Sequence, residues 1–510
     1  MRLGLAAGFL AGACQGAGAF VCTSDGDCVD GGMSGRCEPT GFCSFPDEVC
    51  PSMQRYGEHA GELSGECVAL GEDTEAGSSA GTDGGTTLDP DDGTGGSDDA
   101  AATGQGGPTL EFVDDDEQDF AAGQLTGLVW TNGGIQLTGD AQGVLVSRVF
   151  DAGESVVWHT VRWIPQAPYG KPLPGGGQSE QGYAEGNIDM SANLLLLPLD
   201  GQGTAGPFEL LEDASGLGHD LLLETEAGVP WVIGPFGTAL ADDMASYAHN
   251  GAWKDAFSFG EDDFTWSMWV RSDAPCDGED VSNNQVYLGI EGQGSDRSHL
   301  WLGCRYPTSS QCTGDGGLGR IGGTYSANHG ATGPRLCGSS ELVDEQWHHV
   351  AVTKSGHVQA EAAVYFDGFA EDMESFAYAD PIDFPSGTEL ALGAFSGGTF
   401  PAAGTFDEVA IWRRALAPAE IYSLYQRGVL RLRIQVRACD DPQCVGGEFV
   451  GPDGTSQTVY EDVAHALGPG KPLPLPESLV GRYFQYRAEL EGASMSSPVL
   501  ELVAVAADVL

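Results

Sequence analysis

Along most of this chain the hydrophobic and polar positions alternate with a period of two. Residues 264–271 read Phe-Thr-Trp-Ser-Met-Trp-Val-Arg, with a large apolar side chain at every second position. Residues 430–438 read Leu-Arg-Leu-Arg-Ile-Gln-Val-Arg-Ala, and the alternation there is complete. Successive side chains of a strand point to opposite faces of its sheet. Both segments therefore predict half-buried β-strands, and similar runs rich in Val, Phe and Trp predict further strands from residue 110 onward.

One short helix is predicted from Pro418 onward. Proline suits the first helical turn, and Ile421, Leu424 and Tyr425 share one apolar face at helical spacing. Ala417 precedes the proline, so the usual polar cap is absent. This helix must therefore be held by packing.

The charge of the chain excludes some partners. Lys and Arg total 22 against 75 Asp and Glu, which gives a formal net charge of -53. Such a surface repels nucleic acid and anionic lipid. The acids are spread along the chain, so they indicate a solubilising surface more than one site. A polycationic partner and cation binding stay open, because carboxylates also ligate calcium.

The first 19 residues have the pattern of a secretory signal peptide. One positive charge precedes a short apolar run and small residues, and cleavage after Ala19 fits. The alternative is a lipid anchor on Cys14, which follows an imperfect lipoprotein box. No other stretch is long and apolar enough to span a membrane. We expect a secreted, extracellular or cell-surface protein.

The cysteines after Cys14 are even in number and form three even groups. An exported protein with this arithmetic is expected to be disulfide-bonded, each group within its own module. The groups are Cys22, Cys28, Cys37, Cys43, Cys50 and Cys67; Cys276, Cys304, Cys312 and Cys337; and Cys439 and Cys444.

The composition divides the chain into segments. Residues 20–70 are rich in Cys, Gly and Asp and predict a small disulfide-held module. Residues 71–109 hold almost no large apolar side chain and predict a disordered acidic linker. Residues 110–188 and 429–510 each hold too few strands for a stable sandwich of their own. We expect them to form one discontinuous β-sandwich, with residues 189–428 inserted as a separate domain. The phrase Gly-Lys-Pro-Leu-Pro at 170–174 recurs at 470–474, and both copies are interpreted as exposed turns.

Seven short segments of the inserted domain follow one another in a recognisable order. They are 194–200 (Leu-Leu-Leu-Leu-Pro-Leu-Asp), 213–216 (Asp-Ala-Ser-Gly), 234–240 (Gly-Pro-Phe-Gly-Thr-Ala-Leu), 264–271, 347–353 (Trp-His-His-Val-Ala-Val-Thr), 364–368 (Val-Tyr-Phe-Asp-Gly) and 406–412 (Phe-Asp-Glu-Val-Ala-Ile-Trp). Together they resemble a laminin-G-like, concanavalin-A-like jelly roll. The predicted fold class is therefore all-β and multidomain: a jelly roll inserted in a discontinuous β-sandwich, behind an N-terminal disulfide-rich module.

The resemblance implies candidate site residues. Members of this family frequently hold calcium at the rim, which points to Asp213 in the acidic turn and Asp407 in the last strand, with Asp200 as a weaker candidate. The alternative is that Asp213 caps a turn and Asp407 pairs with an arginine. The long insertion from Cys276 to Cys337 is the candidate ligand surface, because loops carry recognition on β scaffolds. Its aromatic candidates are Trp301, Tyr306 and Tyr325.

No catalytic motif is found. The glucanase pattern Glu-x-Asp-x-x-Glu and HExxH are both absent from the sequence. His348 and His349 are adjacent on a predicted strand and point to opposite faces, so a structural role is favoured for them. The chain is therefore interpreted as a secreted, non-catalytic protein that binds carbohydrate or another cell-surface polymer. The alternatives are a structural or adhesive surface component without a small ligand and, more remotely, a cryptic glycoside hydrolase.

Overall fold

The chain folds into two compact units, residues 1–101 and 102–510. The structure, a computed structural model, describes residues 29–30, 33–37, 43–46, 54–56, 109–139, 141–250, 255–272, 274–276, 281–292, 298–306, 320–326, 333–377, 384, 388–461, 469–493 and 496–509. The predicted signal peptide and the predicted acidic linker up to residue 108 lie outside the described residues.

The first unit contains short antiparallel strands. β1 (Val29–Asp30) pairs with β2 (Met33–Ser34), and β4 (Cys43–Pro46) lies between β3 (Arg36–Cys37) and β5 (Gln54–Tyr56). Cys43 is buried and disulfide-bonded. The predicted disulfide partners Cys22, Cys28, Cys50 and Cys67 lie outside the described residues.

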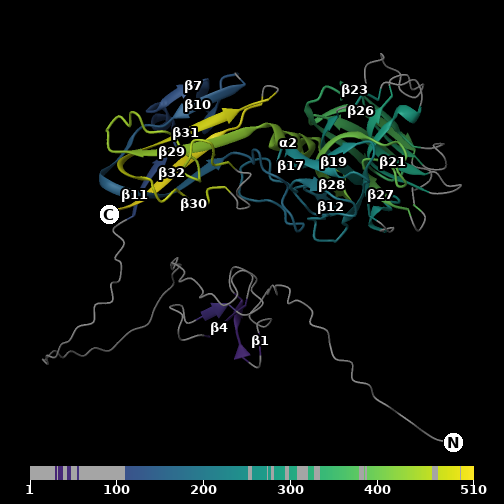
Figure 1. The fold of residues 1–510 in the computed structure, drawn as a ribbon, viewed down its shortest axis with the longest axis horizontal. Coiled ribbons are helices and arrows are strands. Elements are labelled where there is room, and N and C mark those ends of the chain that lie inside the picture. The colour runs from purple at the N-terminus through teal and green to yellow at the C-terminus, as the bar shows by residue number, and fades with distance from the viewer. Residues whose placement is uncertain are drawn as a thin grey trace, which may run out of the picture. The chain divides into compact units, whose positions relative to one another are not determined.

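The second unit contains a β-sandwich built from both ends of its sequence. Its strands are β6 (Thr109–Asp114), β7 (Gln124–Thr126), β8 (Leu128–Thr131), β9 (Gly134–Leu137), β10 (Gln142–Val146), β11 (Phe150–Pro165), β29 (Arg431–Cys439), β30 (Leu473–Pro474), β31 (Val480–Glu491) and β32 (Leu500–Val509), with one short helix, α1 (Glu117–Ala121). Figure 1 shows blue strands from the start of this unit beside green and yellow strands from its end. β31 pairs with β10 on one side and β29 on the other, while β32 pairs with β6, β9 and β11.

Burial explains why the two flanks of the sequence need each other. The alternating apolar residues of β29 point into a core that also holds Trp158 of β11 and Phe484 of β31. These two rings lie 4.7 Å apart, and the Trp158 indole donates a hydrogen bond to the Gly481 carbonyl. Neither flank alone supplies both faces of this core.

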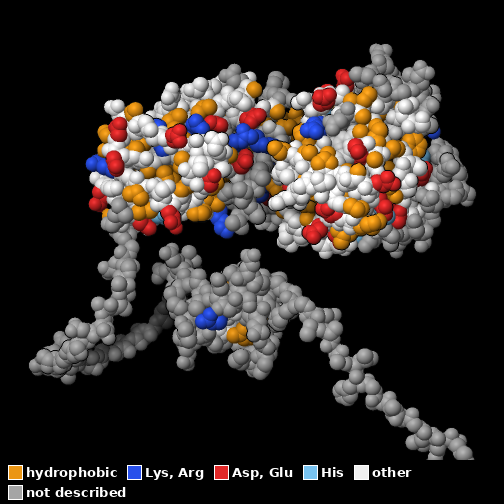
Figure 2. Space-filling model, in the orientation of Figure 1, with side chains coloured by type: hydrophobic (Ala, Val, Ile, Leu, Met, Phe, Trp, Pro, Cys, Tyr) orange, Lys and Arg blue, Asp and Glu red, His pale blue; other side chains and the backbone are white. Residues whose placement is uncertain are grey.

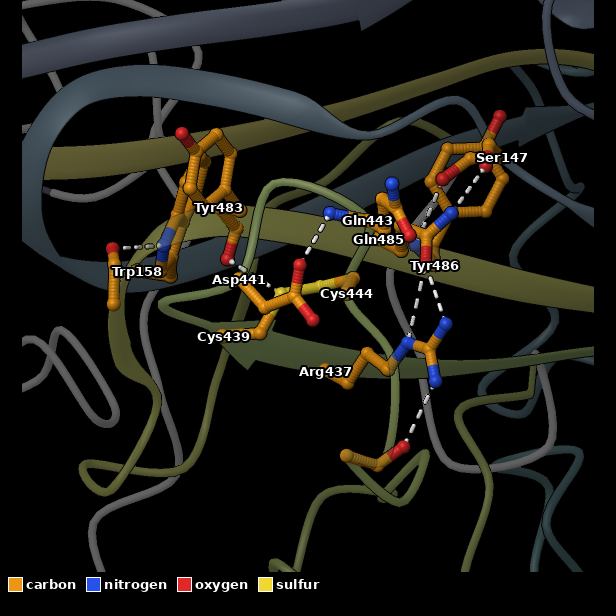
Figure 3. The surroundings of a disulfide bond; sticks show 12 residues. Ser147, Trp158, Arg437, Cys439, Asp441, Gln443, Cys444, Tyr483, Gln485 and Tyr486 are labelled. Atoms are coloured by element: carbon orange, nitrogen blue, oxygen red, sulfur yellow. Dashed lines mark hydrogen bonds between the residues drawn. A yellow bond between two sulfur atoms is a disulfide. The ribbon is translucent and has the colours of Figure 1, made fainter.

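A disulfide joins Cys439 at the end of β29 to Cys444, as the sequence predicts (Figure 3). Nearby, the Arg437 guanidinium donates to the Gln485 side-chain oxygen of β31 and to the Gly447 carbonyl. The bridge and Arg437 together fix the loop after β29 against the sandwich.

The inserted domain is a jelly roll of two antiparallel sheets. Nine strands form the first sheet: β12 (Asn193–Leu197), β13 (Thr204–Ala205), β16 (Val229–Gly234), β17 (Gly237–Asp243), β19 (Phe264–Ser272), β24 (Trp347–Ser355), β25 (Gln359–Phe366), β26 (Phe369–Ala377) and β28 (Ala403–Trp412). Eight form the second: β14 (Leu210–Leu211), β15 (Leu221–Glu224), β18 (Tyr247–His249), β20 (Gln285–Glu291), β21 (His299–Arg305), β22 (Arg320–Ser326), β23 (Arg335–Glu341) and β27 (Leu390–Leu392). Two short 3-10 helices, η3 (Asp255–Phe257) and η4 (Val281–Asn283), lie between strands.

The main core of the jelly roll lies between its two sheets, and the outer face of the nine-stranded sheet is covered by the predicted helix. That helix, α2 (Pro418–Val429), buries Ile421, Leu424 and Tyr425. Its first turn is held by Glu420, which accepts a hydrogen bond from the Ala417 amide and two from Arg414. These elements confirm the predicted all-β class with an inserted jelly roll.

A buried ion cluster holds the end of α2 against the segment that links β11 of the sandwich to β12 of the jelly roll. Both terminal nitrogens of Arg427 lie 2.8–2.9 Å from the two oxygens of Glu180, and both side chains are at most 5% exposed. Arg427 also donates to the Lys171 and Pro172 carbonyls, and the Lys171 ammonium lies 3.0 Å from Glu180. The interpretation of residues 170–174 as an exposed turn was therefore wrong, whereas Lys471 in the second copy of the phrase is exposed.

Replacing Arg427 with Met should destabilise the protein by about 3 kcal/mol, because it leaves Glu180 buried with Lys171 as its one remaining ion-pair partner among the described residues. Urea unfolding followed by tryptophan fluorescence measures the loss. The control is Arg482→Met, which breaks a two-point pair with Asp151 at the surface and should leave stability nearly unchanged. Equal losses of unfolding free energy in the two variants would show that the burial of Arg427 does not make its ion pair more important than a surface pair.

Candidate functional site

The outer face of the eight-stranded sheet carries an unusual set of side chains. The inner face of this sheet lines the main core through residues such as Leu223, Ala248 and Leu392. Their neighbours along each strand point outward. Strand register aligns Leu222 of β15 with His249 of β18, and His249 with Ala391 of β27.

A polar group of four residues from three segments lies on this face. The His249 ring lies between two carboxylates: its Nε2 is 3.4 Å from Glu224 and its Nδ1 is 3.3 Å from Glu389. Tyr247 is in register with Glu224, and its ring lies 5.5 Å from the His249 ring, tilted by 30°. Burial and the charges of Glu224 and Glu389 raise the pKa of the Tyr247 hydroxyl. We call Glu224, Tyr247, His249 and Glu389 the outer-face cluster.

An exposed apolar edge adjoins the outer-face cluster. Leu210 of the edge strand β14 is in register with Leu222, and the Phe208 amide donates to the Leu223 carbonyl. Phe208 is 65% exposed and Leu210 is 56% exposed. Phe208 also has a φ of 64°, a conformation that costs a residue with a bulky side chain free energy. An aromatic ring displayed next to polar groups is the usual chemistry of a sugar-binding surface.

The aromatic residues that the sequence singled out lie elsewhere. Trp301 of β21 is on the same face but only 5% exposed, because it packs with Val286 and Phe395. Phe395 belongs to a small hairpin that lies over Gly289. Trp301 therefore does not present its ring to solvent, contrary to the expectation of a stacking surface. Tyr306 is half-buried. Tyr325 lies in β22, and its side chain is not among those that the structure describes.

The disulfide framework of the insertion is partly described. Cys276 is bonded to Cys304, and Cys337 is also disulfide-bonded, as the sequence predicts. Cys312 lies outside the described residues.

A second candidate site is a bulge in β28. Ser267 of β19 opposes Ala410 and Trp269 opposes Asp407, so two residues of β28 face one residue of β19. One of them is Glu408, whose φ is 47°. The bulge buries two adjacent carboxyl groups, Asp407 and Glu408, at 0% and 3% exposure.

In each of these two carboxyl groups, one oxygen accepts a hydrogen bond and the other has no partner among the described residues. Asp407 accepts a hydrogen bond from the Phe236 amide, and Glu408 accepts one from the Leu173 amide. The other oxygen of each is buried without a hydrogen-bond partner among the described residues. Burial, the neighbouring Glu408 and Asp200 raise the pKa of Asp407 well above its usual range, and burial raises the pKa of Glu408 to about 8.

The three predicted calcium ligands do not form one cluster. Asp200 acts electrostatically on both Asp407 and Glu408 and accepts a hydrogen bond from the Thr238 amide. Asp213, by contrast, accepts four hydrogen bonds, which hold the turn after β14. Their donors are the amides of Leu196, Ser215 and His219 and the Ser215 hydroxyl.

Among the described residues, only one group of three potential metal ligands has ligand atoms within 4.8 Å of one another. It is the group Asp115, Asp116 and Asp119 at the start of α1. Asp116 there caps the helix, and Asp119 pairs with Arg148. These contacts explain the group without an ion.

His348 and His349 have separate structural roles, as their spacing predicts. His349 is buried, its Nε2 lies 2.8 Å from the Ser267 hydroxyl, and burial lowers its pKa to about 3. The two nitrogens of His348 each lie 3.0 Å from a carboxylate, of Asp367 and of Asp344. Burial alone lowers the pKa of His348, but these two carboxylates outweigh it and raise the pKa above its ordinary value.

The outer-face cluster was not found from the sequence. Glu224, His249 and Glu389 lie in no motif, and only the pairing of β15, β18 and β27 brings them together. A weak signal exists for Tyr247 and His249, because they alternate with Ala248 in a strand of period two.

A family model matches most of the jelly-roll domain. Residues 246–422 match the family model of the concanavalin A-like lectin/glucanases superfamily. No curated protein matched the chain. Within the described residues, no helix is long and apolar enough to cross a membrane.

Solved structures give distant matches. Domain 4 of AbnA, a GH43 extracellular arabinanase from Geobacillus stearothermophilus in complex with arabinotriose, is 16% identical, with 46% of this chain and 98% of that chain covered and a TM-score of 0.33. The binding domain of Paraclostridial Mosquitocidal Protein 1 is 14% identical, with 55% and 70% covered and a TM-score of 0.32. Trypanosoma rangeli sialidase is 18% identical, with 47% and 33% covered and a TM-score of 0.31. Matches this distant assign neither a ligand nor a reaction to this chain.

The carboxylate clamp on His348 predicts a pH dependence. Because the folded pKa is raised, the stabilisation is complete below the ordinary value of about 6.5 and is lost as pH rises through the folded pKa. At low pH the unfolding free energy of the wild type should be on the order of 1 kcal/mol larger than that of His348→Gln. This difference in unfolding free energy should become smaller as pH rises. Urea unfolding across pH measures it. The control is His357→Gln, at an exposed histidine. A difference in unfolding free energy that grows with rising pH would contradict stabilisation of protonated His348 by Asp344 and Asp367.

Proposed function

We propose that this chain is a secreted, non-catalytic recognition protein that binds carbohydrate through the outer face of its eight-stranded sheet. The observation that carries the proposal is the exposed Phe208 next to the outer-face cluster. The match of residues 246–422 to the concanavalin A-like lectin/glucanases superfamily supports the same class of ligand. A fold alone does not determine a function, so the residues of the site decide which ligand is proposed.

The residues present have the chemistry that sugar recognition needs. A sugar ring offers an apolar face, which stacks on exposed aromatic rings such as Phe208 and the partly exposed Tyr247. Its hydroxyl groups donate hydrogen bonds, and the carboxylates of Glu224 and Glu389 are strong acceptors. The two kinds of group lie side by side here, because β14, β15 and β18 are consecutive in the sheet.

The same two carboxylates raise the alternative of a glycoside hydrolase. Such an enzyme needs one carboxyl group held protonated and a second held ionised, in different environments. Glu224 and Glu389 instead share one partner, His249, and both are partly exposed to water. This arrangement favours binding over hydrolysis.

Secretion is part of the proposal. Disulfides such as Cys276–Cys304 and Cys439–Cys444 form and persist in oxidising compartments. The signal-peptide pattern before Phe20 agrees with them. Mass spectrometry of the mature N-terminus distinguishes cleavage after Ala19 from lipidation at Cys14.

Truncating Phe208 should weaken carbohydrate binding about fivefold, because an aromatic stacking contact is worth on the order of 1 kcal/mol. A glycan array identifies a ligand, and calorimetry then compares the wild type with Phe208→Ala. The matched control is Phe369→Ala on β26 of the other sheet, where the ring is 57% exposed, and it should leave affinity unchanged. Silence on every glycan would favour a structural or adhesive component, and release of sugar from the ligand would favour a hydrolase.

We also propose that Asp407, with Asp200, holds a calcium ion. The support is the buried Asp407 Oδ1, which has no hydrogen-bond partner among the described residues, together with the electrostatic action of Asp200 on Asp407. Calcium prefers carboxylate and carbonyl oxygens. Asp213 is left out of this set, because both of its oxygens already accept two hydrogen bonds.

Calorimetry should show calcium binding to the wild type and none to Asp407→Asn. Without calcium the variant should be at least as stable as the wild type, since an amide costs less to bury than an uncompensated carboxylate. Asp213→Asn should behave in the opposite way, losing stability at the turn and keeping calcium. Calcium binding that survives Asp407→Asn and fails in Asp213→Asn would overturn this assignment.

A further inference from the structure

We infer that the outer-face cluster selects glycans whose sugars carry a protonated amine, such as polymers of glucosamine, over neutral and anionic glycans. The inference rests on the proposed carbohydrate-binding function and names the class of sugar. It stands on the charge, the aromatic groups and the strand register of the outer face.

The charged groups at the site are acidic. Glu224 and Glu389 flank His249 on opposite sides, and their side chains are 39% and 22% exposed. The charges that act on the Tyr247 hydroxyl come from these same two glutamates. In the described part of the chain, neither glutamate forms an ion pair with Lys or Arg. A ligand placed here therefore meets two carboxylates whose ion-pair partner among the described residues is His249, with no Lys or Arg.

Two carboxylates discriminate between ligand charges. A neutral sugar donates hydroxyl hydrogen bonds to them, whereas an ammonium group adds the attraction between opposite full charges to its hydrogen bonds. A uronic or sialic acid is repelled by the same groups. The carboxylates of Glu224 and Glu389 therefore favour a cationic sugar, and this selection does not require a deep pocket.

The aromatic groups favour a sugar amine over other amines. Phe208 is exposed beside β15, and the partly exposed ring of Tyr247 lies against Gly398 in the segment after β27. An ammonium beside an aromatic face gains further attraction. A lysine-rich peptide supplies the charge without the flat apolar face of a sugar ring. The pairing of β14, β15 and β18 fixes both kinds of contact on one side of the sheet.

The charge of the whole chain acts in the same direction. Acidic side chains are distributed over the visible face of the folded unit (Figure 2), and the formal net charge is -53. Such a field speeds the approach of a polycation and slows that of a polyanion. It does not choose a binding site, which is why the local contacts of the outer-face cluster decide the selectivity.

The test compares an oligomer of glucosamine with the same oligomer after acetylation of every amine, which removes the charge and keeps the sugar chain. Calorimetry on the full chain should give an affinity at least tenfold higher for the free-amine oligomer at low salt. That preference should shrink as salt rises, because screening weakens the charge contacts. Glu224→Gln with Glu389→Gln should remove most of the preference and keep binding of the acetylated oligomer. Glu154→Gln, an exposed acid of the sandwich, is the matched control and should change nothing.

Each other outcome rejects a defined claim. Equal or tighter binding of the acetylated oligomer through Phe208 would overturn the charge selectivity and leave carbohydrate recognition standing. Poly-lysine binding as tightly as the glucosamine oligomer, with no loss in Phe208→Ala, would show that charge alone is recognised and overturn the inference. No binding of either oligomer, with silence on a glycan array, would overturn the proposed function together with the inference.

Discussion

The buried guanidinium of Arg427 is the interaction on which the arrangement of the second unit depends. It lies at the end of α2, where the chain leaves the jelly roll, and it holds Glu180 and the carbonyls of residues 171–172, where the chain enters it. A buried charge without its partner costs several kcal/mol, so the entry and exit segments must stay together. An insertion whose two ends are joined in this way leaves the host sandwich free to close around one core.

The jelly roll then has two outer faces with different roles. α2 covers the outer face of the nine-stranded sheet, and beneath it the bulge at Glu408 buries a pair of carboxyl groups. The outer face of the eight-stranded sheet is left partly open, with a small hairpin over Trp301 and the aromatic edge at Phe208 exposed. Recognition is proposed for the open face, and cation binding for the covered one.

Local pattern predicted much of this fold from the sequence. Strand periodicity found β19 and β29, and helical spacing found the buried face of α2, because each signal lies within a few neighbouring residues. Long-range packing was not accessible in the same way. Lys171 is buried by an ion pair with Glu180, and Trp301 is buried by Phe395 of a distant hairpin. The grouping of Glu224, His249 and Glu389 depends on the register of three strands, which no local pattern encodes.

Carbohydrate binding is proposed for the outer face of the eight-stranded sheet. The most direct test is hydrogen–deuterium exchange of the full chain with and without a glycan that binds it. Binding at this face should slow exchange only in residues 206–224, 245–250 and 389–400, which form and flank it. Protection confined to the sandwich strands β29 and β31, with no change on the outer face, would contradict it.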